Sequence, residues 1–297
     1  MAIVRIEEMI YSVTDVETGA AFFTDAGLEP LASSDANRSF RTPANQYLRL
    51  RPAPSSGEAP GVDEIIWGVD DDAGLRAVHA ELARDRTVER DAEGTLHTHD
   101  DGGYCIAFKV AAPTPVTAAQ PQTNLLNDVR RRNRGVEPHG RARPLRIIHV
   151  ALDILKEARE RANAFYTDRL HFRAIDRVAP MGTFMQCEGD IEHHNLLLCH
   201  RPDQRTVNHV ALEVSDIDEV IEGGNYMTER GWKESRRLGR HNLGSNVFRM
   251  FHAPCGGRIE FAFDMDRMDK SFVPRVWDKT PPHHLWMLKF PGDAGQS

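Results

Sequence analysis

Two long stretches of the chain repeat the same order of apolar and polar positions. In each stretch an apolar run typical of a strand precedes an amphipathic helical segment, and a second apolar run then leads through an acidic turn into another helix. Each stretch closes with a glycine turn and a final strand. The corresponding segments are 5–25 and 146–168, 62–67 and 207–212, and 102–108 and 256–263. This self-similarity predicts an internal duplication built from four strand–helix–strands units.

The predicted strands are short, hairpin-like and more numerous than the helices. This balance argues against a doubly wound parallel sheet, in which single strands and helices alternate. It favours an α+β protein in which each half forms a curled mixed sheet with helices on its outside. Asp71, and Asp216 after Ser215, precede two of the expected helices and are suitable N-caps.

A break in this pattern divides the chain into predicted domains. Prolines, glycines and the basic run at 130–134 keep the region around it irregular and indicate a solvated linker or a packing arm. We predict an N-terminal domain over 1–112, a linker over 113–145, a C-terminal domain over 146–264 and a tail over 265–297.

Composition narrows the class of protein. The length of 297 residues suits two domains, and the net charge of −7 argues against a nucleic-acid binder, which needs a basic face. No apolar run approaches the ~20 residues that span a bilayer, and residues 1–8 lack the layout of a signal peptide. The four cysteines form no C-x-x-C pair. We therefore expect a cytoplasmic protein that binds neither nucleic acid nor membrane.

Histidine is concentrated in the second half, which carries 10 of the 14 histidines from His149 onward. Three polar residues there interrupt apolar strands at corresponding places: His149 and His209, each in the string His-Val-Ala-Leu, and Glu260. A lone strand histidine is most often a hydrogen-bonded core residue, but burying three such groups separately is costly. Two imidazoles and one carboxylate are the facial triad that holds non-haem Fe(II).

The first half offers a poorer ligand set. Its corresponding positions are Glu8, Glu64 and Ile106, and the isoleucine supplies no ligand atom. Glu8 and Glu64 could still form a second carboxylate site, which is the less favoured alternative.

The chain resembles the type I extradiol ring-cleavage dioxygenases of the vicinal oxygen chelate superfamily, the relatives of 2,3-dihydroxybiphenyl 1,2-dioxygenase. The resemblance is strongest from Arg146 to Phe263 and rests on the strings around His149, His209 and Glu260. It implies tandem βαβββ modules in two similar domains, with a degenerate first domain. It also implies that these three residues bind Fe(II), or Mn(II) as the alternative metal.

The resemblance assigns two catalytic residues. His194, 15 residues before His209, matches the acid–base histidine of the family. His241, in the fairly specific string Gly-Arg-His-Asn-Leu-Gly-Ser-Asn, matches the histidine that faces the substrate hydroxyls. For His193 we expect a neighbour on the opposite strand face.

Further positions are expected to face the substrate. The family usually carries a tyrosine ten residues before the glutamate ligand, but Met250 stands there and cannot donate a hydrogen bond. His252 likewise replaces a more usual arginine. With Phe184 and Asn242 these residues form the expected substrate-binding set, and the tail around 281–286 is expected near the site entrance.

The resemblance implies an oxidoreductase that uses O2 to cleave a catechol-type ring beside its hydroxyls, giving a semialdehyde or keto acid. The expected partners are a small aromatic diol, O2 and further copies of the chain in a homo-oligomer. One alternative is another metalloenzyme of the same fold, of the 4-hydroxyphenylpyruvate dioxygenase type or an isomerase of thiol adducts. The other is an inactive relative that binds an aromatic compound, which Met250 keeps open. The ring substituents and the cleavage position are not determined by the sequence.

Overall fold

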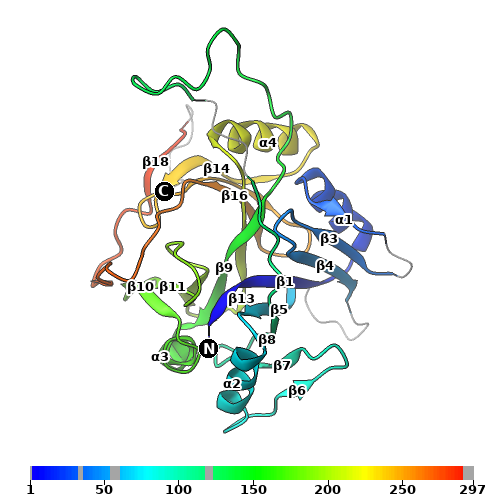
Figure 1. Cartoon of the computed structure of the whole chain (residues 1–297), viewed down its shortest axis with the longest axis vertical. Coiled ribbons are helices and arrows are strands. Elements are labelled where there is room, and N and C mark those ends of the chain that lie inside the picture. The colour runs from blue at the N-terminus through cyan, green and yellow to red at the C-terminus, as the bar shows by residue number, and fades with distance from the viewer. Residues whose placement is uncertain (1, 33–35, 54–60, 118–122, 290–297) are drawn as a thin grey trace.

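A computed structural model describes residues 2–32, 36–53, 61–117 and 123–289, and it contains two curled mixed sheets with helices outside them (Figure 1). The first sheet has the strand order β2-β3-β4-β1-β5-β8-β7-β6. Its elements are β1 (Ile3–Val13), α1 (Val16–Asp25), β2 (Glu29–Pro30), β3 (Arg38–Arg41), β4 (Tyr47–Pro52), β5 (Gly61–Val69), α2 (Asp72–Leu82), β6 (Glu89–Arg90), β7 (Leu96–His99) and β8 (Cys105–Val110).

The second sheet repeats this plan and adds an edge strand on each side. Its order is β17-β10-β11-β12-β9-β13-β16-β15-β14-β18. Its elements are β9 (Arg146–Leu155), a 3₁₀ turn (Lys156–Ala158), α3 (Arg159–Ala164), a π-helical turn (Phe165–Arg169), β10 (Arg173–Val178), β11 (Gly182–Gln186), β12 (Leu196–Arg201), β13 (Thr206–Glu213), α4 (Ile217–Glu229), β14 (Glu234–His241), β15 (Val247–His252), β16 (Arg258–Phe263), β17 (Arg275–Trp277) and β18 (His284–Met287).

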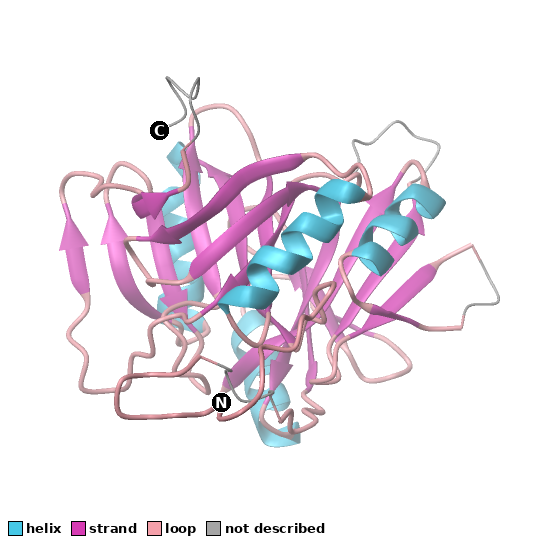
Figure 2. Cartoon of the chain, turned by 90° about the horizontal axis from the view of Figure 1, so that it is seen from above, coloured by secondary structure: helices cyan, strands magenta, loops and turns pink. Residues whose placement is uncertain are grey.

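Each sheet is therefore assembled from two βαβββ modules, which confirms the predicted α+β fold and the duplication. In both sheets the first strands of the two modules, β1 with β5 and β9 with β13, pair antiparallel at the centre. The remaining strands of each module extend the sheet outward from that pair. Because every module contributes its own helix, the helices lie on the outside of the curled sheets (Figure 2).

The helices are fixed by caps and by one apolar face. In α4 the Asp216 side chain accepts a hydrogen bond from the Glu219 backbone N–H at 2.8 Å, as the sequence predicts for an N-cap. Val220 and Met227, which lie two turns apart on this helix, are completely buried. Asp71 caps α2 in the same way, accepting from Gly74 N at 2.7 Å.

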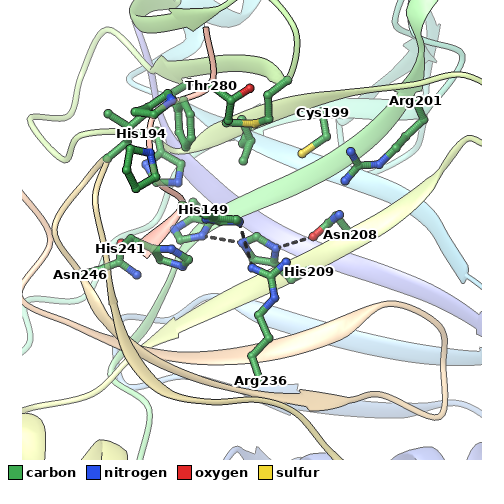
Figure 3. A pocket seen from close by; sticks show the side chains of 17 residues that line it. His149, His194, Cys199, Arg201, Asn208, His209, Arg236, His241, Asn246 and Thr280 are labelled. Carbon is green, nitrogen blue, oxygen red and sulfur yellow. Dashed lines mark hydrogen bonds between the residues drawn. The ribbon is translucent and has the colours of Figure 1, made fainter. Parts of the chain in front are cut away.

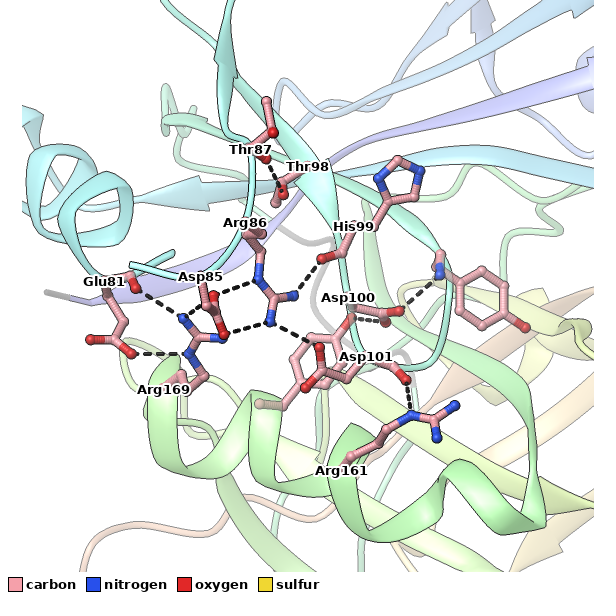
Figure 4. A network of polar contacts seen from close by, with 12 residues as sticks. Glu81, Asp85, Arg86, Thr87, Thr98, His99, Asp100, Asp101, Arg161 and Arg169 are labelled. Carbon is pink, nitrogen blue, oxygen red and sulfur yellow. Dashed lines mark hydrogen bonds and ion pairs between the residues drawn. The ribbon is translucent and has the colours of Figure 1, made fainter. Parts of the chain in front are cut away.

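The two halves share one continuous hydrophobic core and an extended polar seam. Figure 4 shows Arg169, from the second half, between Glu81 and Asp85 of the first, with Nε–Oε1 and Nη1–Oδ2 distances of 3.0 and 2.9 Å. The Tyr166 hydroxyl donates to buried Asp100 at 2.7 Å, and Tyr104 donates to the Asp153 carbonyl at 2.6 Å. These contacts with the first half thereby stabilise the first module of the second half.

The linker and the tail take different courses. Most described linker residues between 113 and 145 are exposed and outside regular structure, although Ala142 is buried against Gly223 of α4. The tail adds β17 and β18 to opposite edges of the second sheet. Among the described residues, no helix is both long and apolar enough to cross a membrane.

The acidic pair of the first half is occupied by cations of the chain itself. Glu8 forms ion pairs with Arg49 and Lys109, at 2.9 and 3.4 Å, and Glu64 contacts His97 Nδ1 at 2.8 Å. These contacts give both carboxylates partners within the first half.

Candidate metal centre and substrate pocket

Three neighbouring strands at the centre of the second sheet bring the predicted ligands together. In the β9–β13 ladder His149 lies opposite Ala211, and in the β13–β16 ladder Glu260 lies opposite the same alanine. His209 is two residues from Ala211 and so shares its face of the sheet. The small alanine side chain leaves the space in which the three longer side chains converge.

The ligand atoms are close enough to hold one ion. His149 Nε2 and His209 Nε2 are 3.0 Å apart, and Glu260 Oε2 lies 3.6 and 3.2 Å from them respectively. Adjacent ligands at about 2.1 Å from an octahedral cation are roughly 3 Å apart, so the spacing fits a facial triad. Glu260 Oε2 is buried and makes no hydrogen bond within the described chain. A cation is the partner that such an orphaned carboxylate oxygen requires.

Neighbouring side chains orient two of the ligands. Asn208 Nδ2 donates to Asp153 at 3.0 Å, which leaves Asn208 Oδ1 to accept from His209 Nδ1 at 2.9 Å. His209 Nε2 then presents its lone pair to the centre. Asn246 Nδ2 donates to Glu260 Oε1 at 2.6 Å and leaves Oε2 for the ion. Burial, with lesser contributions from His149 and Arg258, lowers the pKa of His209 well below its usual value, so its imidazole is neutral.

A buried chain of side chains fixes the tautomer of His194. His193 Nε2 lies 2.8 Å from Asp176 Oδ2, and His193 Nδ1 lies 3.0 Å from His194 Nδ1. If His193 donates to the carboxylate, its Nδ1 must accept from His194 Nδ1–H. His194 Nε2 then carries a free lone pair. Burial first, and the surrounding imidazoles second, lower the pKa of His194 well below its usual value, so the ring is neutral at pH 7.

His241 approaches the centre from β14. Its Nε2 lies 3.8 Å from Glu260 Oε1, and its ring stacks on Phe248 with the centroids 4.1 Å apart. His283 and His284 of the tail bring further ring nitrogens within 4.8 Å. These three imidazoles are stacked, with interplanar angles of 7–27°. Ring-nitrogen lone pairs lie in the ring plane, so stacked rings do not direct three of them at one ion.

The candidate ligands His149 and His209, together with His194, line a cavity of about 230 Å³ (Figure 3). Its apolar wall includes Phe184, which meets the His194 ring edge-on, with the centroids 5.1 Å apart. Residues 280–283 of the tail close one side, at the expected entrance. The remaining lining residues are Met181, Leu197, Cys199, Arg201, Asn208, Arg236, His241, Leu243 and Asn246.

Three of the predicted substrate contacts do not reach this cavity. Met250 is completely buried opposite Glu260 in the β15–β16 ladder, and neither it nor Asn242 lines the pocket. His252 is exposed at the end of β15, paired with Arg258, and does not line the pocket. The two-residue period of a strand shows which side chains share a face of the sheet. It does not show which of them line the pocket, because the curl of the sheet leaves only part of that face accessible. Of the four predicted substrate contacts, only Phe184 lines the cavity.

Sequence reasoning missed Asp176, Asn208, Asn246 and Arg236 as members of the site. Asn246 ends the string that identified His241, and Asn208 directly precedes His209. Inspection of these motifs could therefore have indicated both residues. Asp176 lies in the ordinary-looking strand Arg-Ala-Ile-Asp-Arg-Val and gave no such signal.

Asp176 predicts a measurable acid sensitivity. Burial alone would raise its pKa, but hydrogen bonds from His193, Arg275 and Trp277 outweigh burial and lower the pKa to about 2. A depressed carboxyl pKa stabilises the fold above the unfolded-state pKa of about 4, and this contribution is lost as the pH falls toward 2. Asp176→Asn should therefore lower the unfolding free energy at pH 7 by on the order of 2 kcal/mol.

Denaturant unfolding of the wild type and Asp176→Asn between pH 7 and pH 3 measures this contribution. The difference between them should shrink by about half at pH 3. A difference that stays constant over this range would mean that the carboxylate charge contributes nothing to stability. Asp203→Asn, at an exposed carboxyl in the turn between β12 and β13, is the control for a surface charge.

Comparison with known proteins gives the site its family context. Residues 146–261 match the model of the Glyoxalase/Bleomycin resistance protein/Dioxygenase superfamily. This segment is therefore similar to that superfamily, in agreement with the vicinal oxygen chelate resemblance, and it contains all three residues of the candidate triad.

Particular relatives can be named from sequence and from structure. Metapyrocatechase 2 of Cupriavidus necator is 34% identical over 126 residues, which cover 42% of this chain and 38% of that protein. The matching segment thus spans about two fifths of this relative. The structure of BphC, a halotolerant catechol dioxygenase, superposes with a TM-score of 0.76 at 16% identity, covering 97% of this chain and 95% of the other. The Mn(II)-bound glyoxalase of Novosphingobium aromaticivorans gives 0.73 at 20% identity, with coverages of 94% and 89%.

Proposed function

We propose that this protein is an extradiol dioxygenase that uses O2 to open a catechol-type ring beside its two hydroxyls. The observation that carries the proposal is the convergence of His149, His209 and Glu260 at the polar end of a pocket whose other wall is apolar. Two further histidines, His194 and His241, flank the same point. The relatives named above as a metapyrocatechase and a catechol dioxygenase support the same reaction class.

The proposed metal is Fe(II), held by the two imidazoles and the carboxylate, with Mn(II) as the alternative that the same ligands accept. When bound, this ion would supply open positions for the diol and O2 and share electron density between them. The triad carries a single negative charge. With a divalent ion bound, the centre would carry a net positive charge, which is compatible with binding the diol as an anion.

His194 is placed to remove a proton from the substrate. Its Nε2 lone pair is free because Nδ1–H is committed to His193. When Nε2 takes a phenolic proton, the positive charge that forms on His194 is shared through His193 with the Asp176 carboxylate. The same proton can later be returned to an oxygen of the substrate. Asp176 and His193 are positioning residues, because they act through His194.

His241 and the apolar wall have complementary roles. The His241 ring, held against Phe248, offers a ring nitrogen to oxygen anions that develop near Glu260. Phe184 and its apolar neighbours hold the aromatic ring and exclude water from it. Because Met250 supplies no hydroxyl, stabilisation of negative oxygen falls to the histidines.

The test is O2 consumption across a panel of catechols after anaerobic reconstitution with Fe(II) or with Mn(II). We expect one O2 per ring opened and a yellow semialdehyde-type product, and the metal that co-purifies with the protein identifies the resident ion. Tight binding of a diol without O2 uptake by either form would instead support the aromatic-binding relative. Conversion of a thiol adduct without O2 would support the isomerase.

We also retain the prediction that the protein is a cytoplasmic homo-oligomer. Size-exclusion chromatography with light scattering, and fractionation of the producing cells, test the two parts separately.

A further inference from the structure

A guanidinium that pairs with no carboxylate among the described residues lines the pocket beside the candidate metal ligands. Arg236, on β14, donates through Nη1 to His283 Nε2 at 3.0 Å. Within the described chain this is the only hydrogen bond of the Arg236 side chain, and no ion pair involves it. Figure 3 shows its side chain extending toward His209, which lines the same pocket.

The surrounding charges make this arginine unusual. Burial, and next the nearby Arg258, lower the pKa of Arg236, yet a guanidinium remains charged at neutral pH. Arg258 itself is bound to Asn208, and Arg201, also on the pocket wall, pairs with Asp153 at 2.8 Å. The three arginines are thus balanced by one carboxylate, since Glu260 is committed to the metal centre. A partly buried cation in excess favours an anionic ligand.

We propose that Arg236 binds a carboxylate substituent on the ring of the aromatic diol. The inference rests on the proposed function and narrows the substrate class from catechols in general to catechols with an acidic side chain. The planar fork of arginine pairs with a carboxylate through two parallel hydrogen bonds. A diol bound at the triad and a ring against Phe184 leave the Arg236 side of the cavity for the substituent.

The location also defines a competing role. Arg236 lies close enough to the centre to act electrostatically on His209. A guanidinium that contacted the diol oxygens would assist every catechol equally. A guanidinium that binds the substituent would assist only catechols with an acidic side chain. The difference in affinity between charged and uncharged catechols therefore distinguishes the two roles.

Binding measured without turnover tests the proposal. The probes are 2,3- and 3,4-dihydroxyphenylacetate and their uncharged carboxamides, titrated calorimetrically and anaerobically into the metal-reconstituted full chain. We expect the wild type to bind at least one acid about tenfold or more tightly than its amide, the range of a charge-assisted hydrogen bond. Arg236→Gln should abolish this ratio and Arg236→Lys should retain part of it. Arg177→Gln removes an exposed arginine outside the pocket and should leave the ratio unchanged.

Each of the other possible results overturns either the inference or the proposed function. Equal affinity of the wild type for acid and amide would overturn the inference, as would equal weakening of both by Arg236→Gln, which would assign the arginine to the diol oxygens. O2 uptake with neutral catechols would keep the proposed function intact in those cases. Charge-selective binding with no ring opening under O2 would uphold the inference and overturn the proposed function.

Discussion

Replacing His209 by alanine should abolish stoichiometric metal binding while the protein still unfolds in one cooperative transition. The imidazole supplies one of three ligand atoms that lie within 4.8 Å of one another, and the remaining pair is an incomplete site. Loss of only an orienting neighbour weakens metal binding about 10–100-fold, so loss of the ligand should cost at least about 100-fold. Metal content after chelation and reconstitution measures the effect, and thermal unfolding reports the fold.

Two comparison variants sharpen this result. Asn208→Ala removes the hydrogen bond to His209 Nδ1 and should give an intermediate loss of affinity, about 10–100-fold. His97→Ala removes a histidine that contacts Glu64 in the first half and should leave the metal content unchanged. Full metal in His209→Ala would show that the ligand set is wrong, and a loss in His97→Ala would place a metal in the first half.

Replacing His194 by alanine should lower the rate of ring opening by about 10²–10⁴ while the metal content stays near that of the wild type. The reason is geometric: the ring lines the pocket with its Nε2 lone pair free, but it belongs to the acid–base chain rather than to the triad. Single-turnover rates and metal analysis of the same sample separate the two effects. Parallel losses of metal and rate would assign His194 to the ligand set.

His200 provides the matched control for this substitution. It is a largely buried histidine on β12, six residues further along, and it faces a different cavity from the metal centre. His200→Asn should leave both the metal content and the turnover within about twofold of the wild type, the range of an ordinary substitution away from a site. A large loss of turnover would mean that the effect of His194→Ala is not specific to its position in the pocket. His193→Asn should fall between the two, since it disturbs only the orientation of His194.

The triad was the most predictable part of the site. Polar residues in otherwise apolar strands are costly to bury, so their repetition in one duplicated pattern was informative without coordinates. The strings around His149 and His209 match because the two strands occupy equivalent places in successive modules. Their antiparallel pairing at the sheet centre then brings the two rings together.

The positioning residues depend on features that a linear pattern does not encode. Asn208 and His209 are adjacent, and in a regular strand their side chains would point to opposite faces. A register shift between Val207 and His209 breaks that alternation and lets Asn208 reach the His209 ring. Asp176 reaches His193 only because β10 and the segment before β12 are brought together by the folding of the first module.

By itself, the sequence determined the duplication and the α+β modules and predicted the three ligands, because the order of apolar and polar positions can be compared between the two halves of the chain. The tertiary structure decided which members of a charged strand face the pocket. The strand β14 contains Arg236, Arg237 and Arg240, and two register irregularities with β15 interrupt its alternation. Long-range packing of the curled sheet therefore selects Arg236 for the pocket, while Arg240 pairs with Asp264.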